Sequence, residues 1–286
     1  MQPRVATTTP LPFRPMPSGK KSKQMRRAAS APPPVQSKGG PRRVRQANPK
    51  VLAIVGAVVV LAAIGIGLAL ALGGGSKASN NYPAIGTLKN ALPGASDVQT
   101  LFKGIPQNGL TLGNPKAPVT MVEYIDLQCP FCQQFETQVM PDIINKYVRT
   151  GKVKIEARVL AFIGADSSRG RKAMIAAAGQ NRGYNFSEIL YYNQGTENTG
   201  WLSDAMVGQA VSSIPGIHVH TVLNQESSGA VSNQAKGFDA QGAADKVLGT
   251  PTLYAGKSGT KGKQIPLSSP TDSKSVVTAL DAALAS

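Results

Sequence analysis

Residues 119–160 carry three successive secondary-structure patterns, which constrain the fold more than any other part of the chain. Residues 119–125 are rich in β-branched and aromatic side chains, which is typical of a strand. Apolar side chains then recur at helical spacing from Phe135 to Val148, and Gly151 follows as a helix-ending glycine. Residues 153–160 alternate between apolar and polar side chains, which indicates a second strand. Strand, helix and strand in this order predict a βαβ unit with parallel strands.

The chain beyond this unit is first helical and then returns to short strands. We predict helices around residues 173–178, 186–191, 202–211 and 231–248. Residues 249–252 then lead into a short strand, and residues 264–267 predict the last strand. Residues 276–284 predict an amphipathic helix, with Asp272 or Ser273 as its N-cap. A helical block therefore interrupts an α/β domain.

Both cysteines of the chain lie in one motif, Cys129-Pro130-Phe131-Cys132, between the first strand and the helix. Two cysteines cannot build a disulfide scaffold or a four-cysteine zinc site, so these classes of protein are excluded. Cys129 would begin the helix, where unpaired backbone N–H groups and the positive end of the helix dipole favour a thiolate. Pro130 suits the first helical turn because it has no N–H group to leave unpaired. We predict Cys129 as the nucleophile and Cys132 as the resolving thiol.

Two other interpretations of the cysteine pair are open. A structural disulfide across so short a loop would restrict the unfolded chain less than a long-range disulfide does. A zinc site would need two more ligands, and His218 and His220 are not spaced as in a zinc finger. A Cys-x-x-Cys motif after a strand, in a βαβ pattern, is typical of thioredoxin-like redox proteins. We therefore predict a redox dithiol that uses no metal ion and no other cofactor.

Four short motifs occur in order along the chain: Ala117-Pro118-Val119, Glu123-Tyr124-Ile125-Asp126, Cys-Pro-x-Cys and Gly249-Thr250-Pro251-Thr252. With these motifs, the chain from about residue 113 to residue 286 resembles the DsbA-like family of thiol–disulfide oxidoreductases, within the thioredoxin superfamily. The resemblance implies an α/β thioredoxin fold with an inserted helical domain. The thioredoxin-like domain would then comprise residues 109–165 and 249–286, and the inserted domain residues 166–248.

The resemblance also implies roles for several residues outside the cysteine pair. Pro251 would be a cis proline next to the cysteines, and Thr250 would face the sulfur atoms. An ordinary trans proline at the start of a strand is the alternative for Pro251. Glu123 matches an acidic residue that is proposed in this family to shuttle protons, because a buried carboxyl group can exchange protons near neutral pH. An edge or surface position for Glu123 is the alternative. We expect Asp126 to end the strand or cap the helix, and Phe131 to offer apolar surface to client proteins.

The N-terminal part of the chain has a different composition. Residues 1–50 contain 12 Lys and Arg residues and no acidic residue, which predicts a disordered basic leader. Residues 51–72 carry no charged or polar side chain, and a helix of this length is about 33 Å long, enough to cross a bilayer core. We predict a retained transmembrane helix, because a cleaved signal peptide, the alternative, has a shorter leader and a shorter apolar region. Residues 73–108 predict a flexible stalk rich in Gly, Asn, Pro and Ser.

The formal net charge of +16 first suggests a nucleic-acid-binding protein. Residues 73–286, however, hold 19 basic and 15 acidic side chains, and a net charge of +4 is ordinary for a soluble domain. The excess positive charge lies before the apolar segment and predicts a cytoplasmic N-terminus, with the catalytic domain outside the cytoplasm. We therefore predict no nucleic-acid partner.

These observations predict a single-pass protein of the cell membrane, a thiol–disulfide oxidoreductase that oxidises thiols of exported client proteins. By family analogy, a membrane quinone-linked oxidase would recycle it. The dipeptide Pro130-Phe131 lacks the histidine that is common in strong oxidants of this family, which predicts a milder oxidant. The alternatives are a disulfide reductase or isomerase of the same fold, and a non-catalytic, surface-tethered binding or chaperone module.

Overall fold

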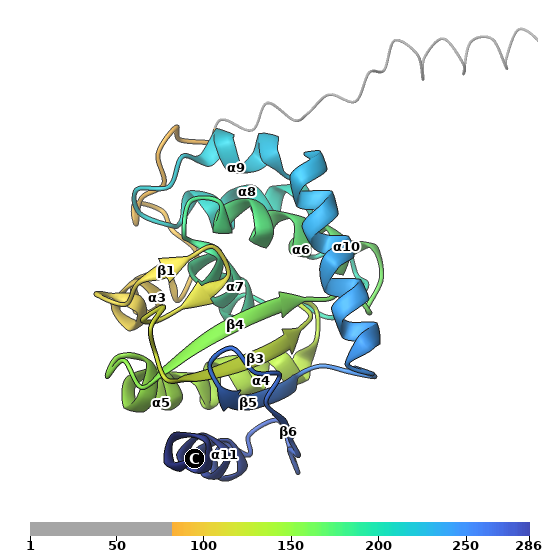
Figure 1. Cartoon of the computed structure of the whole chain (residues 1–286). Helices are drawn as coiled ribbons and strands as arrows, with labels where there is room; N and C mark the ends of the chain where they lie inside the picture. Colours follow the sequence, from red (N-terminus) through yellow and green to blue (C-terminus); the bar gives the residue numbers. More distant parts are fainter. Residues whose placement is uncertain (1–81) are drawn as a thin grey trace, which may run out of the picture. The chain divides into compact units, whose positions relative to one another are not determined.

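A computed structural model describes residues 82–286 (Figure 1). The predicted leader at residues 1–50, the predicted transmembrane helix at 51–72 and residues 73–81 of the predicted stalk lie outside the described residues. Among residues 82–286, none of the helices combines the length and the apolar character that crossing a membrane requires.

A mixed β-sheet lies at the centre of the described part, with the strand order β1-β2-β4-β3-β5-β6. Its two longest strands, β3 (Val119–Ile125) and β4 (Val153–Val159), pair in parallel over their full lengths, and every other pair of neighbours is antiparallel. The remaining strands are β1 (Gln107–Asn108), β2 (Thr111–Leu112), β5 (Thr252–Lys257) and β6 (Lys263–Ile265). All residues of β3 are buried. The predicted βαβ unit with parallel strands is therefore confirmed.

The predicted helix after the first strand is divided into three segments: α4 (Pro130–Gln138), α5 (Met140–Ile143) and the π-helical turn η1 (Ile144–Val148). The break falls where Pro141 enters the first turn of α5. Proline has no backbone N–H group and cannot bond to the preceding turn of an α-helix. The chain therefore starts a new helix there, although the apolar spacing continues across the break.

A block of helices lies between β4 and β5 in the chain. It contains α6 (Ala165–Ala178), α7 (Gly183–Tyr192), α8 (Asp204–Ser212), α9 (Val219–Gln225) and α10 (Gly229–Ala244). The four predicted helices correspond to α6, α7, α8 and α10, whereas α9 was not among them. Helix α6 packs against each of the other four, and α10 also contacts β4. Figure 1 shows α8 and α9 at the top of the view and the sheet beneath them.

The C-terminal elements follow the sequence pattern closely. Strand β6 overlaps the predicted last strand, and α11 (Ser273–Ala285) includes the predicted helix. The Asp272 side chain accepts a hydrogen bond from the backbone N–H of Ser275 at 3.0 Å and so caps the first turn of α11. Helix α11 packs against β3 and β5, on the sheet that carries the cysteine motif.

The predicted flexible stalk is wrong for residues 82–108. This range contains α3 (Ala95–Phe102) and β1, and the apolar side chains of Ala95, Val98 and Phe102 are buried. Their spacing of three and four residues places them on one face of α3, which packs against α7. The Phe102 ring meets the Tyr184 ring edge-on, with the centroids 6.2 Å apart. The polar composition of the segment hid this short amphipathic helix.

We expect the substitution Phe102→Ala to lower the free energy of unfolding by about 3 kcal/mol, because it leaves a cavity at the contact with Tyr184. Denaturant unfolding of the purified protein measures this. Leu88→Ala is the matched control, because Leu88 is 44% exposed and its loss should change stability by less than about 0.5 kcal/mol. Equal effects of the two substitutions would mean that α3 is not packed on the domain.

Candidate active site

The turn between β3 and α4 presents the cysteine motif. Cys129 is the N-cap residue of α4, and Pro130 occupies the first helical turn, as predicted from the helix-start preference of proline. The side chain of Cys132, one turn further along α4, is completely buried, while Cys129 is 5% exposed. Both cysteines are free thiols, so the structure represents the reduced dithiol state.

The surroundings of Cys129 favour its thiolate. The pKa of Cys129 is lowered to about 6, chiefly by a hydrogen bond from the Cys132 side chain. The Thr250 side chain and the backbone N–H groups of Cys132 and Phe131 also lower this pKa, whereas burial acts in the opposite direction. Backbone donors at the start of a helix are expected to act in this way.

Cys132 has the opposite tendency. Its pKa is raised well above the usual value, first by burial and then by its interactions with Cys129. A buried thiol next to a thiolate keeps its proton because a second negative charge would be poorly solvated and repelled. The structure therefore gives the two sulfur atoms different chemistry, with Cys129 as a thiolate and Cys132 as a protonated thiol.

The loop before β5 brings Thr250 and Pro251 beside the cysteine motif. The peptide bond between Thr250 and Pro251 is cis, as the family resemblance implies. In its thiol form, Cys129 donates a hydrogen bond from Sγ to the backbone carbonyl of Thr250 at 3.2 Å. Thr252 Oγ1 donates to the carbonyl of Gly249 at 2.7 Å and closes the turn on its other side. Cys129 and Thr250 lie 121 positions apart in the chain, and the fold brings them into direct contact at the Cys129 sulfur.

Glu123 lies on β3 and is buried, so the surface position considered from the sequence is wrong. Glu136 on α4 and Glu188 on α7 are buried as well, and the three carboxyl groups form what we call the buried glutamate cluster. Burial is the largest cause of the raised pKa of each, and the pKa of Glu188 reaches about 8. The charge of Glu136 further raises the pKa of Glu123, and the charge of Glu188 raises that of Glu136.

The sequence patterns above do not single out Glu136 or Glu188. A signal for both is present in the chain, because each acidic residue stands inside an apolar stretch. Glu136 follows Phe135, which belongs to the buried stripe of α4, and Glu188 precedes Ile189 in the most apolar part of α7. An acidic residue at such a position is seldom fully buried without a specific role or partner. Among residues 82–286, no group of three or more His, Cys, Asp or Glu side chains is arranged to hold a metal ion.

Asp126 follows the end of β3, as expected, but its carboxylate does not cap α4, which has no side-chain cap. It instead accepts hydrogen bonds from the backbone N–H of Phe162 at 2.7 Å and of Ile163 at 3.1 Å. It also accepts from the backbone N–H of Gln128 at 2.9 Å and from Ser167 Oγ at 2.6 Å. Asp126 therefore ties the turn before Cys129 to the loop that follows β4.

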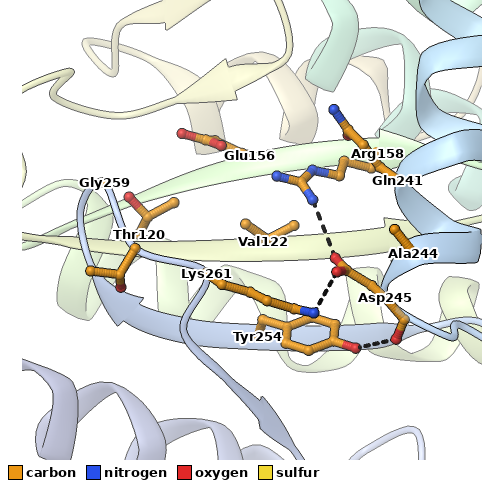
Figure 2. Close-up of a pocket in the computed structure, with 11 residues that line it drawn as sticks. Thr120, Val122, Glu156, Arg158, Gln241, Ala244, Asp245, Tyr254, Gly259 and Lys261 are labelled. Atoms are coloured by element: carbon orange, nitrogen blue, oxygen red, sulfur yellow. Dashed lines mark hydrogen bonds and ion pairs between the residues drawn. The ribbon is translucent and has the colours of Figure 1, made fainter.

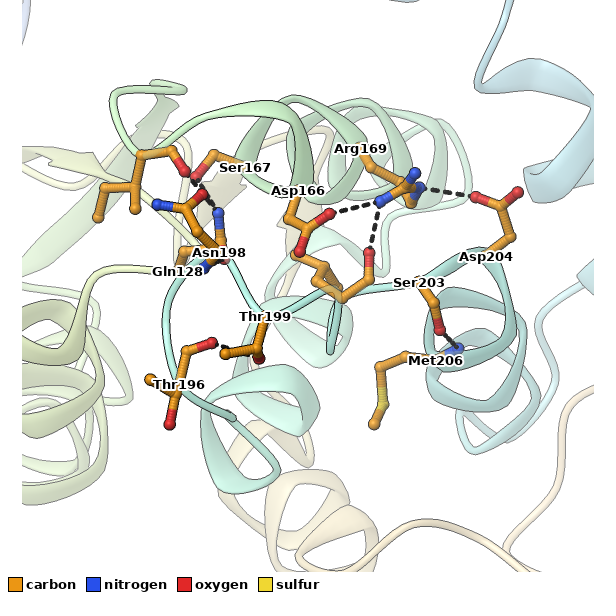
Figure 3. Close-up of polar contacts among 12 residues, drawn as sticks. Gln128, Asp166, Ser167, Arg169, Thr196, Asn198, Thr199, Ser203, Asp204 and Met206 are labelled. Atoms are coloured by element: carbon orange, nitrogen blue, oxygen red, sulfur yellow. Dashed lines mark hydrogen bonds and ion pairs between the residues drawn. The ribbon is translucent and has the colours of Figure 1, made fainter.

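The side chains of Gln128 and Gln194 join this turn to the helical block. Gln128 donates from Nε2 to the carbonyl of Ile163 at 2.7 Å and accepts at Oε1 from the backbone N–H of Asn198 at 3.0 Å (Figure 3). Gln194 Nε2 donates to the carbonyls of Leu127 at 3.0 Å and of Cys129 at 3.3 Å. Neither glutamine is predicted from the sequence, since nothing local to either one indicates a distant partner.

Ion pairs hold the neighbouring part of the helical block. Arg169 on α6 pairs with Asp166 at 2.8 Å and with Asp204, the first residue of α8, at 2.7 Å (Figure 3). It also donates to the carbonyl of Leu202 at 2.9 Å. Ser203 caps α8 by accepting from the backbone N–H of Met206 at 3.2 Å. The loop that contacts Gln128 is therefore anchored at its far end.

Exposed apolar side chains belong to the same segments that contact the cysteine motif. Phe131, between the two cysteines, is 55% exposed, and Leu248, shortly before Thr250, is 96% exposed. Phe162 is 52% exposed and neighbours Ile163, whose carbonyl binds Gln128. Scattered exposed apolar residues are normal on a protein surface, but these lie on the three segments that build the site.

Comparisons with known proteins agree with this fold. A thioredoxin family model matches residues 106–277. The probable disulfide bond formation protein D of Bacillus cereus is 27% identical over 147 residues, which cover 50% of this chain and 68% of that protein. Disulfide bond formation protein D of Bacillus subtilis is 26% identical over 161 residues, covering 54% and 69% respectively.

Solved structures show the same fold. Oxidised BdbD from Bacillus subtilis superposes with a TM-score of 0.56 at 22% identity, covering 64% of this chain and 97% of that chain. The DsbA of Chlamydia trachomatis superposes with a TM-score of 0.52 at 19% identity, covering 60% and 91%. Each superposition shows a similarity of fold, namely the thioredoxin-like fold with its helices.

A parallel βαβ unit with a dithiol at its turn, faced by a cis proline, defines a thiol–disulfide oxidoreductase of thioredoxin fold. The chain belongs to the thioredoxin family, and it is a DsbA-like thiol–disulfide oxidoreductase. The family and enzyme class predicted from the sequence motifs are confirmed. The roles of the individual site residues stay predictions.

Proposed function

We propose that this protein oxidises thiols of client proteins outside the cytoplasm through the Cys129–Cys132 pair. The observation that carries the proposal is the difference between the two thiols, since the pKa of Cys129 is lowered to about 6 and that of Cys132 is raised. A stabilised Cys129 thiolate favours the reduced form of the enzyme, so that the enzyme disulfide gives up its bond readily to a client.

In the proposed reaction, a client thiolate attacks Sγ of Cys129 in the enzyme disulfide. A bond forms between the client sulfur and Cys129, the bond between Cys129 and Cys132 breaks, and Cys132 leaves as a thiolate that takes up a proton. A second client thiolate then attacks the client sulfur of this mixed disulfide, and Cys129 leaves as a thiolate. The client dithiol loses two electrons and becomes a disulfide, and the enzyme disulfide gains them and becomes a dithiol.

Other residues would support these two steps. We propose that Glu123 exchanges the proton that Cys132 takes up, because burial raises the pKa of the Glu123 carboxyl and so favours its protonated form. The backbone at Thr250 and Pro251 would lie alongside an extended client segment, and the Thr250 side chain would stabilise the Cys129 thiolate. Exposed Phe131 and Leu248 would contact apolar side chains of unfolded clients.

We further propose that the domain is held at the outer face of the cell membrane by residues 51–72, with residues 1–50 in the cytoplasm. The support is the uncharged segment and the charge difference across it in the sequence. Relatives named as disulfide bond formation proteins support the oxidising direction. A membrane quinone-linked oxidase would then regenerate the enzyme disulfide, by analogy with the family.

The redox potential of the Cys129–Cys132 couple tests the direction. We expect a value between about −200 and −120 mV, measured by equilibration with glutathione, because thiolate stabilisation makes the disulfide oxidising. A value near the potential of thioredoxin, about −270 mV, would favour a reductase and contradict the proposal. If the Cys129→Ser variant supports client maturation as well as the unchanged protein, the chain acts as a binding module instead.

A further inference from the structure

Asp245, at the C-terminal end of α10, is the centre of a polar network on the sheet. Its carboxylate accepts a hydrogen bond from the Tyr124 hydroxyl at 2.6 Å and pairs with Lys261 Nζ at 2.7 Å and with Arg158 Nη1 at 3.5 Å. Its backbone carbonyl accepts from the Tyr254 hydroxyl at 3.0 Å. Figure 2 shows Asp245 between Arg158 and Lys261, at one side of a polar pocket of about 370 Å³.

The network brings together parts of the chain that the cysteine motif also uses. Tyr124 lies on β3, the strand that leads into Cys129, and Arg158 lies opposite it on β4. Arg158 Nη1 also donates to the Tyr124 hydroxyl at 2.8 Å, so the tyrosine is held from both sides. Lys261 comes from the turn between β5 and β6. Asp245 therefore joins α10 to three neighbouring strands or turns of the sheet.

Asp245 is also where the chain leaves α10 for the cis-proline loop. Lys246 has a positive φ of 55°, a left-handed conformation that ends the helix. Val247 then donates from its backbone N–H to the carbonyl of Gly242 at 2.9 Å, and its side chain is 8% exposed. Leu248, the next residue, turns outward with 96% of its surface exposed. The path from Asp245 to Thr250 is only five residues long and is pinned at its start.

We propose that Asp245 is a positioning residue for thiol–disulfide exchange: its contacts with Tyr124, Arg158 and Lys261 fix the loop that sets Thr250 against Cys129. Thr252 Oγ1 holds the other end of this loop through the carbonyl of Gly249. Without the Asp245 carboxylate, this end of the loop would keep only hydrogen bonds of its backbone, such as those at the backbone carbonyl of Asp245 and the backbone N–H of Val247. The Thr250 side chain, which favours the Cys129 thiolate, would then be placed less accurately, and the thiolate would lose part of its stabilisation.

The direction in which the pKa of Cys129 shifts in an Asp245 variant distinguishes a positioning role of Asp245 from a simple effect of its charge. Removing a negative charge from the protein favours a thiolate, so electrostatics alone would leave the pKa of Cys129 unchanged or lower it. Loss of the contact with the Thr250 side chain disfavours the thiolate and would raise the pKa of Cys129, because this side chain is one of the groups that lower that pKa. Only the positioning role therefore predicts a rise of this pKa in the titration.

The test measures the pKa of Cys129 in the reduced full chain, from the ultraviolet absorbance of the thiolate as a function of pH. We expect Asp245→Ala to raise this pKa by about one unit, which is a tenfold smaller ratio of thiolate to thiol at a given pH. Asp245→Asn should give a smaller rise, because the amide oxygen can still accept from Tyr124. Tyr124→Phe removes one of the Asp245 contacts without changing any charge and keeps the buried ring, so it provides a second variant if Asp245→Ala does not fold.

Asp239→Ala is the matched control. Asp239 lies on the same helix and pairs with Arg171 of α6, away from the cis-proline loop. It should leave the pKa of Cys129 unchanged. An unchanged or lowered pKa in the Asp245 variants, or an equal rise in Asp239→Ala, overturns the proposal. A rise in the Asp245 and Tyr124 variants alone supports it.

Discussion

Iodoacetamide is expected to alkylate Cys129 of the reduced protein at least about 100 times faster than Cys132 at about pH 7. With its pKa at about 6, Cys129 is about 90% thiolate at that pH. Cys132 has a raised pKa and no exposed surface, so its thiolate fraction is below about 1% and the reagent cannot reach it. Peptide mapping by mass spectrometry, at a series of reaction times, measures both rates.

The unfolded chain provides the control for this experiment. In strong denaturant both cysteines lose their surroundings and should react at similar rates, which shows that the folded structure causes the difference. The variant Cys132→Ala should still react at Cys129, but more slowly than the unchanged protein, because it lacks the hydrogen bond that chiefly lowers the pKa of Cys129. Cys129→Ser should show only the slow reaction of Cys132. Faster alkylation of Cys132 in the folded protein would reverse the roles of nucleophile and resolving thiol.

The parts of the site that the sequence predicts are those with a local signal. Cys129 and Cys132 are identified by a motif at the junction of a strand and a helix, and both the strand pattern and the helix pattern adjoin it. Pro251 and Thr250 follow from a second short motif and a family resemblance. Alternation along a strand also places Glu123 on an inward face, although it does not distinguish a buried strand from an edge strand.

The parts that the sequence does not predict depend on tertiary contacts. Gln194 reaches the carbonyl of Cys129 across 65 positions of the chain, and no pattern around either residue indicates the pairing. Asp245 is another example, because its hydrogen bond with Tyr124 spans 121 positions. The helix α3 was missed for a different reason: eight residues with three buried side chains give too weak a period against a background of Gly, Asn and Pro.

Ionisation of Glu188 in the unfolded chain is expected to make the unchanged protein less stable as the pH rises from about 5 to about 8. The substitution Glu188→Gln should remove on the order of 4 kcal/mol of this fall in the free energy of unfolding. The pKa of Glu188 is raised from 4.5 to about 8 in the folded protein, first by burial. Below about pH 4.5 both the folded and the unfolded chain keep the proton on Glu188, so this group does not lower the free energy of unfolding. As pH rises towards 8, the unfolded chain gives up the proton and the folded chain does not, so stability falls.

Glutamine keeps the shape of the side chain but cannot ionise, so the variant should be more stable than the unchanged protein at about pH 8 and similar to it at about pH 5. Denaturant unfolding at both pH values measures the difference. Glu197→Gln is the matched control, because Glu197 is exposed in the loop after α7 and its loss should leave the pH dependence as it was. An equally steep fall in the Glu188→Gln and Glu197→Gln variants would show that Glu188 ionises in the folded protein as it does in the unfolded chain.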